Sequence, residues 1–239
     1  MEETAGQRSE PHEGGIAERL NWLRAAVLGA NDGIVSTAAT VVGVAGVTNT
    51  AAPILIAGTA AVVGGSVSMA LGEYVSVSSQ RDSQQALIEK ERQELREDPE
   101  GELLELAGLY EQKGLTAATA RRVAAELTEH DALAAHLAVE LNIDELEVVN
   151  PWHAAFASAA AFAAGAVLPL LAILLPPAEF RIPVTFIAVL AALAITGAVS
   201  AHVGGSSRRR AMIRLVIGGA LAMAFTFLVG TLLGTTGIA

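Results

Sequence analysis

Cysteine is absent from this sequence of 239 residues, so disulfide frameworks, zinc–cysteine sites and thiol chemistry are excluded. Charged residues are scarce, at 17% of the chain against about a quarter in an ordinary soluble domain. Basic residues are scarcer than acidic ones, 15 against 25, and the formal charge of −10 argues against a nucleic-acid partner. Apolar residues make up 52% instead. The composition therefore indicates a membrane protein with an acidic part.

The acidic residues are concentrated in one segment. Residues 81–150 contain 17 Asp and Glu against 7 Lys and Arg, whereas the rest of the chain holds 8 of each kind. The whole formal charge therefore belongs to one 70-residue insert, which we predict to be a distinct domain.

Five apolar stretches flank this insert, and each supplies the roughly 20 residues that cross a hydrocarbon core of about 30 Å. They are Trp22–Val47, Ile54–Val77, Trp152–Leu175, Ile182–Val203 and Ala211–Thr235. The alternative is a soluble helical bundle, in which five such spans are rare. We expect an all-α membrane protein with five transmembrane helices and a cytoplasmic three-helix acidic insert between the second and third spans. Its expected parts are a disordered polar tail (1–19), spans one and two (20–80), the insert (81–150) and spans three to five (151–239).

Arginines at the short flanks predict the orientation, because Lys and Arg in short loops mark the cytoplasmic side. Arg19 and Arg24 lie at the start of the first span, and Arg208–Arg210 and Arg214 lie between the fourth and fifth. The expected arrangement has the N-terminus and the insert in the cytoplasm and the C-terminus outside.

Proline, glycine and a capping threonine divide the insert into three helices. The predicted helices are Asp82–Glu97, Glu100–Lys113 and a third from Thr116 to about Asn142.

Asp32 lies ten residues into the first span, which places its carboxylate roughly 15 Å deep. A carboxylate there costs about 2.5–3.5 kcal/mol on insertion scales, so we interpret it as functional rather than as a structural hydrogen-bonding group. On the returning second span, Met69 reaches about the same depth, and Glu73 lies one turn nearer the cytoplasm. Two carboxylates and a thioether suit Fe²⁺ or Mn²⁺, and a buried carboxylate can hold either a metal ion or a proton. The three residues predict a transport path, although Met69 taken alone fits a lipid-facing position better.

Gly29, Gly33 and Thr37 form a stripe of small residues around Asp32, at four-residue spacing. Such a stripe is typical of close helix packing. It fits either a self-pairing interface of the first helix or ordinary packing within one bundle, and the sequence leaves both open.

The insert carries three pairs of potential metal ligands, each on one face of a predicted helix. They are Glu91 with Glu94, Glu102 with Glu105, and His136 with Glu140. Any one such pair is common on a solvated helix surface. Their concentration in one domain, in a chain with a membrane carboxylate, predicts a metal-binding site.

Two motifs and the layout resemble the vacuolar iron transporter family. The motifs are Asn31-Asp32-Gly33 in the first span and Ser68-Met69-Ala70-Leu71-Gly72-Glu73-Tyr74-Val75-Ser76 at the end of the second. The resemblance extends over the chain from Leu20 onward. The short, alanine-rich chain indicates a bacterial member, whose location would be the plasma membrane.

The resemblance implies a homodimeric exporter of cytosolic Fe²⁺, and often Mn²⁺, driven by exchange for protons. It implies a path between the first and second helices of the two subunits, at Asp32, Met69 and Glu73. It also implies that the insert binds metal through glutamates, which here are Glu91, Glu94, Glu102, Glu105 and Glu140. His136 stands where some members have methionine, and its imidazole broadens the preference toward other first-row metals. Fe²⁺ or Mn²⁺ is thus expected as the transported and bound ion, with no fixed cofactor.

Two other functions stay open on the sequence. One is a membrane-anchored iron sensor or storage protein without transport. The other is a proton-coupled transporter of another small solute, in which Asp32 is only a proton relay. An enzyme is not expected, since the sequence shows no nucleophile–base constellation and no phosphate loop.

Overall fold

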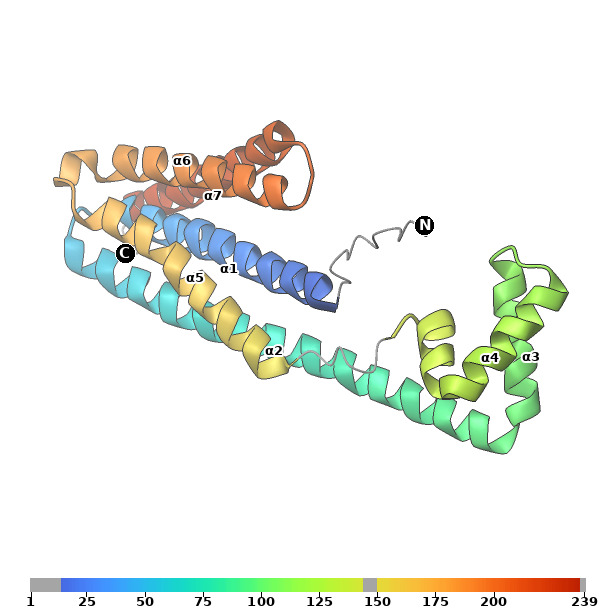
Figure 1. Cartoon of the computed structure of the whole chain (residues 1–239). Coiled ribbons are helices and arrows are strands. Elements are labelled where there is room, and N and C mark those ends of the chain that lie inside the picture. The colour runs from blue at the N-terminus through green and yellow to red at the C-terminus, as the bar shows by residue number, and fades with distance from the viewer. Residues whose placement is uncertain (1–13, 144–149, 237–239) are drawn as a thin grey trace, which may run out of the picture. The chain divides into compact units, whose positions relative to one another are not determined.

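A computed structural model describes residues 14–143 and 150–236, and these residues form helices without any strand (Figure 1). The α-helices are α1 (Gly14–Ala45), α2 (Ala51–Glu97), α3 (Pro99–Gln112), α4 (Ala117–His136), α5 (Pro151–Leu174), α6 (Arg181–Val203) and α7 (Arg208–Thr235). A π-helical turn, η1 (Leu137–Leu141), follows α4, and a short 3₁₀ turn, η2 (Ala178–Phe180), precedes α6. The predicted all-α class is confirmed.

Five helical segments are long and apolar enough to cross a membrane, which confirms the five predicted spans. They are Ala26–Ala45, Ala51–Glu97, Pro151–Leu174, Ala178–Val203 and Arg208–Thr235. With 47 residues, α2 is about 70 Å long, more than twice the thickness of a hydrocarbon core. Its apolar first part therefore suffices for the span, and the charged part from Arg81 onward lies outside it.

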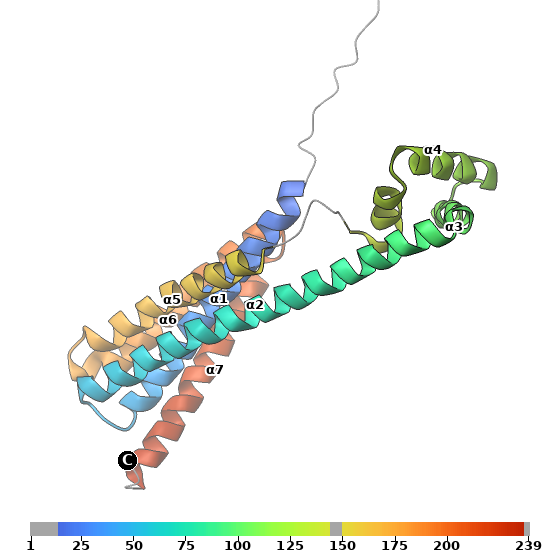
Figure 2. The same ribbon diagram turned by 90° about the horizontal axis from the view of Figure 1, so that it is seen from below.

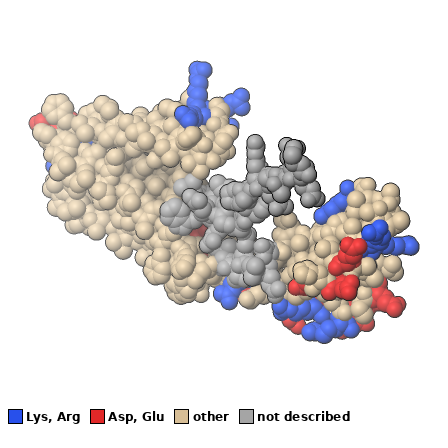
Figure 3. Space-filling model, viewed as in Figure 1, with Lys and Arg blue, Asp and Glu red and all other residues tan. Residues whose placement is uncertain are grey.

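The chain divides into two compact units. Unit 1 comprises residues 1–74 and 151–239, and unit 2 comprises residues 75–150. On the face seen in Figure 3, unit 1 is almost free of charged side chains except at its ends, whereas acidic and basic side chains are dense over unit 2.

Helix α1 is the centre of unit 1 and packs against α5, α6 and α7 (Figures 1 and 2). Glycines bring its backbone against that of α5: a Cβ atom on Gly33 would collide with the Phe162 carbonyl group, and one on Gly165 with that of Ala30. Gly29 faces Ser158 in the same way, and Thr37 is fully buried. Of the two interpretations of the small-residue stripe, packing within one bundle is therefore the one observed.

Unit 2 begins its helices where the turn signals predict. The Asp98 carboxylate accepts a hydrogen bond from the Gly101 amide (2.9 Å), with Pro99 in the first turn of α3. Gly114 has a φ of +101° after α3, a conformation that favours glycine. Thr116 then caps α4 through the Thr119 amide (3.4 Å).

The predicted third helix of the insert, from Thr116 to about Asn142, is wrong in one respect, because it is broken at Asp131. This residue has an extended backbone (φ −162°, ψ 96°), and its carboxylate accepts a hydrogen bond from the Ala134 amide (3.0 Å). An aspartate side chain that bonds nearby amides competes with helix continuation, so Asp131 starts a new helical turn. The expected disordered tail (1–19) also differs in part: residues 14–19 are the first turns of α1, and residues 1–13 lie outside the described residues.

The close contact of α1 and α5 gives a stability prediction. Gly165→Ala should destabilise the protein by about 1–3 kcal/mol, because the added methyl group forces two backbones apart. The matched control is Gly218→Ala on α7, where a Cβ would meet nothing within 4 Å; it should be neutral or slightly stabilising. Thermal unfolding of the two variants in detergent measures the difference, and equal midpoints would contradict the packing.

Candidate metal site and transport residues

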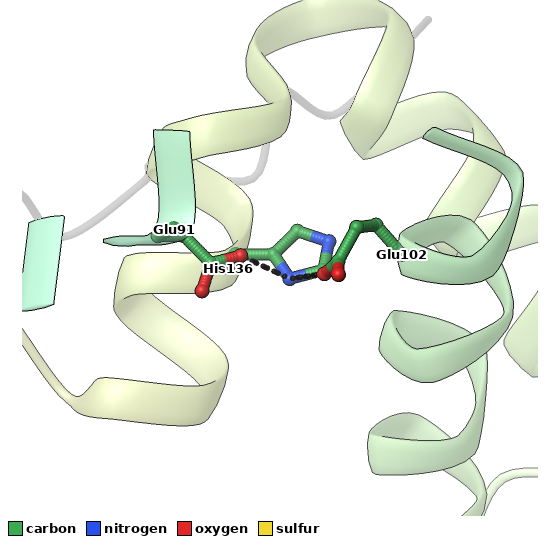
Figure 4. A group of neighbouring side chains, drawn as sticks. All are labelled: Glu91, Glu102 and His136. Carbon is green, nitrogen blue, oxygen red and sulfur yellow. Dashed lines mark ion pairs between the residues drawn. The ribbon is translucent and has the colours of Figure 1, made fainter. Parts of the chain in front are cut away.

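Four potential metal ligands converge in unit 2 from three parts of the chain. Glu91 comes from α2, Glu102 from α3 and His136 from the end of α4, and one ligand atom from each lies within 4.8 Å of the others (Figure 4). The Nδ1 atom of His136 is 2.9 Å from Oε1 of Glu91 and 3.6 Å from Oε2 of Glu102. It is also 3.6 Å from Oε2 of Glu140, in the π-helical turn η1. The imidazole is thus surrounded by three carboxylates.

The break in α4 explains how a histidine reaches this position. The chain changes direction at Asp131, and the segment that follows carries His136 and Glu140 four residues apart. In Figure 4 the imidazole of His136 lies between the carboxylates of Glu91 and Glu102. Glu91 and Glu102 thus meet His136 and Glu140, which come from a segment more than 30 residues later in the sequence.

The centre of the cluster is buried and unsatisfied. The side chains of His136 and Glu91 are 0% and 4% exposed, against 12% for Glu102 and 28% for Glu140. Oε1 of Glu91 and Nδ1 of His136 meet as an ion pair, which requires a protonated imidazole. Neither of these two atoms, nor Nε2 of His136, has a hydrogen-bond partner among the described residues. Buried polar atoms are normally paired, so this cluster is a candidate site for a cation.

The electrostatics of the cluster also favour a cation. Burial raises the pKa of Glu91, and the neighbouring Glu140 raises it further, against the opposing influence of His136. Burial likewise raises the pKa of Glu102, with Glu105 as the next cause. Ionised carboxylates are disfavoured here because they repel one another in a poorly hydrated place. A divalent cation would reverse that balance.

The structure brings four of the six predicted insert ligands together and leaves two at the margin. Glu94 forms an ion pair with Lys90 (2.7 Å), so its carboxylate already has a cation. Glu105 is exposed, and its charge acts on Glu102. Oxygen ligands with one imidazole suit first-row divalent ions. Metal binding by all six remains a prediction.

The predicted transport residues lie in unit 1. Asp32 is exposed on α1, and the Ser36 hydroxyl donates a hydrogen bond to its Oδ1 atom (2.7 Å). Met69 and Glu73 are half-buried on α2. In the described part of the chain, neither Asp32 nor Glu73 belongs to a group of three ligands like the one in unit 2. Their part in a transport path is therefore still a prediction.

Sequence reasoning missed the anchor beside Asp32. Thr196 on α6 donates a hydrogen bond to Oδ1 of Asn31 (2.8 Å), which ties α1 to α6 one residue before the carboxylate. The available signal was a polar residue next to Asp32 within an apolar span, which needs a hydrogen-bond partner in lipid.

The sequence profile of the VIT family matches residues 23–231. The chain is 45% identical to "Vacuolar iron transporter" of Acanthamoeba castellanii over 218 residues, which are 91% of this chain and 80% of that protein. It is 37% identical to "Vacuolar iron transporter homolog 1" of rice, Oryza sativa subsp. japonica, over 100% of this chain and 86% of that protein. It is 34% identical to "Vacuolar iron transporter homolog 2" of Arabidopsis thaliana, over 93% and 89%. These relatives come from an amoeba and two plants and give no support to a bacterial origin.

The raised pKa values of Glu91 and Glu102 predict opposite pH effects with and without metal. Above the ordinary carboxyl value of 4.5, the folded metal-free protein holds more protons than the unfolded chain, so these groups lower stability as pH rises through their raised pKa values. Metal binding requires ionised carboxylates and should strengthen over the same range. Melting curves from pH 4.5 upward, with and without Mn²⁺, measure both trends. A metal-induced shift that does not grow with pH would contradict the site.

Replacing one buried ligand separates metal binding from stability. Glu91→Gln should raise the metal-free melting temperature near pH 7, because it removes a carboxylate whose ionisation is opposed by burial. It should also weaken metal binding by about tenfold or more. Titration calorimetry with Mn²⁺ measures the affinity, and the control Glu111→Gln removes an exposed carboxylate of α3. Equal changes of metal affinity and melting temperature in the two variants would show that Glu91 behaves as an ordinary surface acid.

Proposed function

We propose that this chain, which belongs to the VIT family, exports divalent iron from the cytoplasm in exchange for protons, with manganese as a second cargo. The observation that carries the proposal is the buried cluster of Glu91, Glu102 and His136, whose central donors have no partner among the described residues. The relatives named as iron transporters support iron as the class of cargo. A transporter family also agrees with the expectation that the chain is not an enzyme.

Unit 2 would capture the ion before transport. Three carboxylates and an imidazole offer hard and borderline donors, which suit Fe²⁺ and Mn²⁺. The raised pKa of Glu91 and that of Glu102 mean that metal displaces protons when it binds. Capture would therefore be strongest at the pH of the cytoplasm and weaker in an acidic compartment.

Unit 1 would carry the ion across the membrane by way of Glu73, Met69 and Asp32. The support for this path is the placement of Asp32 on a membrane span with its carboxylate exposed rather than enclosed in the bundle. Its Oδ1 atom accepts a hydrogen bond from the Ser36 hydroxyl of the same helix. That contact leaves Oδ2 for a metal ion or a proton, and competition between the two at one carboxylate is the basis of exchange.

A homodimer is part of this proposal. The apolar part of α2 is poorly covered: 11% of its residues are buried, against 44% in the span of α1. Val63, Val67 and Leu71 are exposed at four-residue spacing, and nothing lies within 4 Å of a Cβ at Gly64 or Gly72. A second copy packed on this face of α2 would cover it and would bring two sets of path residues together.

The direction of transport follows from the proposed orientation. Arg208–Arg210 and Arg214 lie where α7 begins, and the tendency of basic residues to stay in the cytoplasm supports a cytoplasmic location for this end of unit 1. The relatives carry vacuolar names, whereas the sequence led us to expect the plasma membrane. In either membrane, capture by a cytoplasmic unit 2 implies that the ion leaves the cytoplasm.

Proteoliposomes that contain a metal-sensitive dye test the mechanism. Asp32→Asn should reduce Fe²⁺ flux by at least about 100-fold, because an amide cannot exchange a metal ion for a proton. Asp82→Asn is the matched control, since it makes the same change at an exposed position of unit 2. The Fe²⁺ flux of the wild-type protein should also rise when a pH gradient drives protons in the direction opposite to the metal.

The same assay distinguishes the other functions. Metal binding without flux in the wild type would identify a sensor or storage protein. Proton movement that is indifferent to Fe²⁺ and Mn²⁺ would identify a transporter of another solute. Undiminished flux in Asp32→Asn would show that the ion takes a different path.

A further inference from the structure

Unit 1 contains a cavity that the transport residues do not use. It lies between α1, α6 and α7 and has a volume of about 550 Å³, within the range of about 300–1,000 Å³ that is usual for small-molecule sites. Val27, Leu28, Val203 and Leu215 give it apolar walls. Its polar lining groups include Ser200 and Arg214. The cavity is thus an apolar space with a cationic group at its border.

Arg214 is the charged residue that lines this cavity. It lies six residues after the start of α7, about 9 Å along a helix that is long and apolar enough to span a membrane. No carboxylate forms an ion pair with it in the part of the chain that the structure describes, whereas Arg122 in unit 2 pairs with Glu126. A guanidinium near hydrocarbon requires an anion or water.

The surroundings of Arg214 add positive charge of the same sign. Arg208–Arg210 form the first turn of α7, and the Arg208 guanidinium is 2.8 Å from Nδ1 of His202, which supplies no negative charge. Basic side chains are visible at the ends of α6 and α7 in Figure 3, with no acidic side chain among them on that face. The positive end of the α7 dipole lies in the same place.

We propose that this cavity binds an anionic phospholipid. The phosphate would pair with Arg214, since guanidinium groups bind phosphate oxygens through two parallel hydrogen bonds. One acyl chain would lie along the apolar walls, and the Ser200 hydroxyl would face the polar linkage between them. Basic pockets between transmembrane helices are suited to such lipids. A free phosphate ion would leave the apolar walls uncovered, and a zwitterionic lipid would bring its own ammonium group against the other arginines.

Native mass spectrometry of the delipidated full-length protein tests the site, with added phosphatidylglycerol or phosphatidylcholine as the probe. Wild-type protein should retain one phosphatidylglycerol per chain and prefer it to phosphatidylcholine by on the order of tenfold. Arg214→Gln should remove that preference, whereas Arg214→Lys, which keeps the charge, should retain part of it. Ala211→Phe, which reduces the volume of the cavity, should weaken the binding of both lipids. Arg122→Gln removes one charge in unit 2 and should change neither.

Several results would overturn the proposal. Equal retention of the two lipids by wild-type protein would show that charge has no part in binding. An unchanged preference in Arg214→Gln would place the lipid elsewhere. Displacement of the lipid by soluble glycerol 3-phosphate would indicate an anion site without a chain. If Arg214→Gln fails to fold, Arg214→Lys and Ala211→Phe still decide, because full retention in both contradicts a lipid in this cavity. None of these results bears on metal flux, so this proposal and the proposed function can fail separately.

Discussion

The exclusion of charge from hydrocarbon governs how this chain distributes its residues. An ionised side chain at the centre of a bilayer costs about 2.5–3.5 kcal/mol on insertion scales, so a span can contain one useful carboxylate but not a cluster of them. Asp32 is the acidic residue within the span of α1, whereas the 17 Asp and Glu of the segment 81–150 lie in unit 2. The proposed function therefore places coordination by several ligands and passage through lipid in separate units of the protein. Under the proposed function, the ion would exchange many ligands for few as it enters the membrane.

Small residues determine which helices of unit 1 are fixed and which are left uncovered. The glycine contacts bring the backbones of α1 and α5 together, and Asp32, one position before Gly33, remains exposed beside that contact. Helix α2 is attached more loosely: the space beside Gly58 holds the Leu170 side chain, and that beside Gly65 holds the Phe162 ring. Side-chain contacts of this kind allow more adjustment than the contact of two backbones. A path lined by α1 and α2 would therefore have one rigid wall and one adaptable wall.

The sequence predicted features that depend on local chemistry or on composition. Runs of apolar residues specified the five spans, and Pro99, Gly114 and Thr116 specified where helices of unit 2 begin or end, because prolines, left-handed turns and caps act within four residues. The partner of the small-residue stripe could not be predicted, since a stripe fits any helix with a complementary surface. The break at Asp131 was also missed, because an aspartate within a helical pattern more often faces solvent than interrupts the helix.

The break at Asp131 brings His136 to the acids of the candidate site. Burial, rather than the number of acids nearby, distinguishes the acids of the site from the others. Helical spacing alone gave Glu94 and Glu105 the same standing as Glu91 and Glu102. In the folded protein Glu94 has Lys90 as its counter-ion and Glu105 is exposed, so both would be tolerated on any solvated helix. Glu91 and His136 are different, because burial without hydrogen bonds destabilises the metal-free protein. Replacing a buried ion pair with an apolar pair of similar size is often neutral or stabilising in proteins. Under the proposed function, a cation would satisfy the imidazole and the carboxylates together, and the outer acids would supply the negative potential that attracts it.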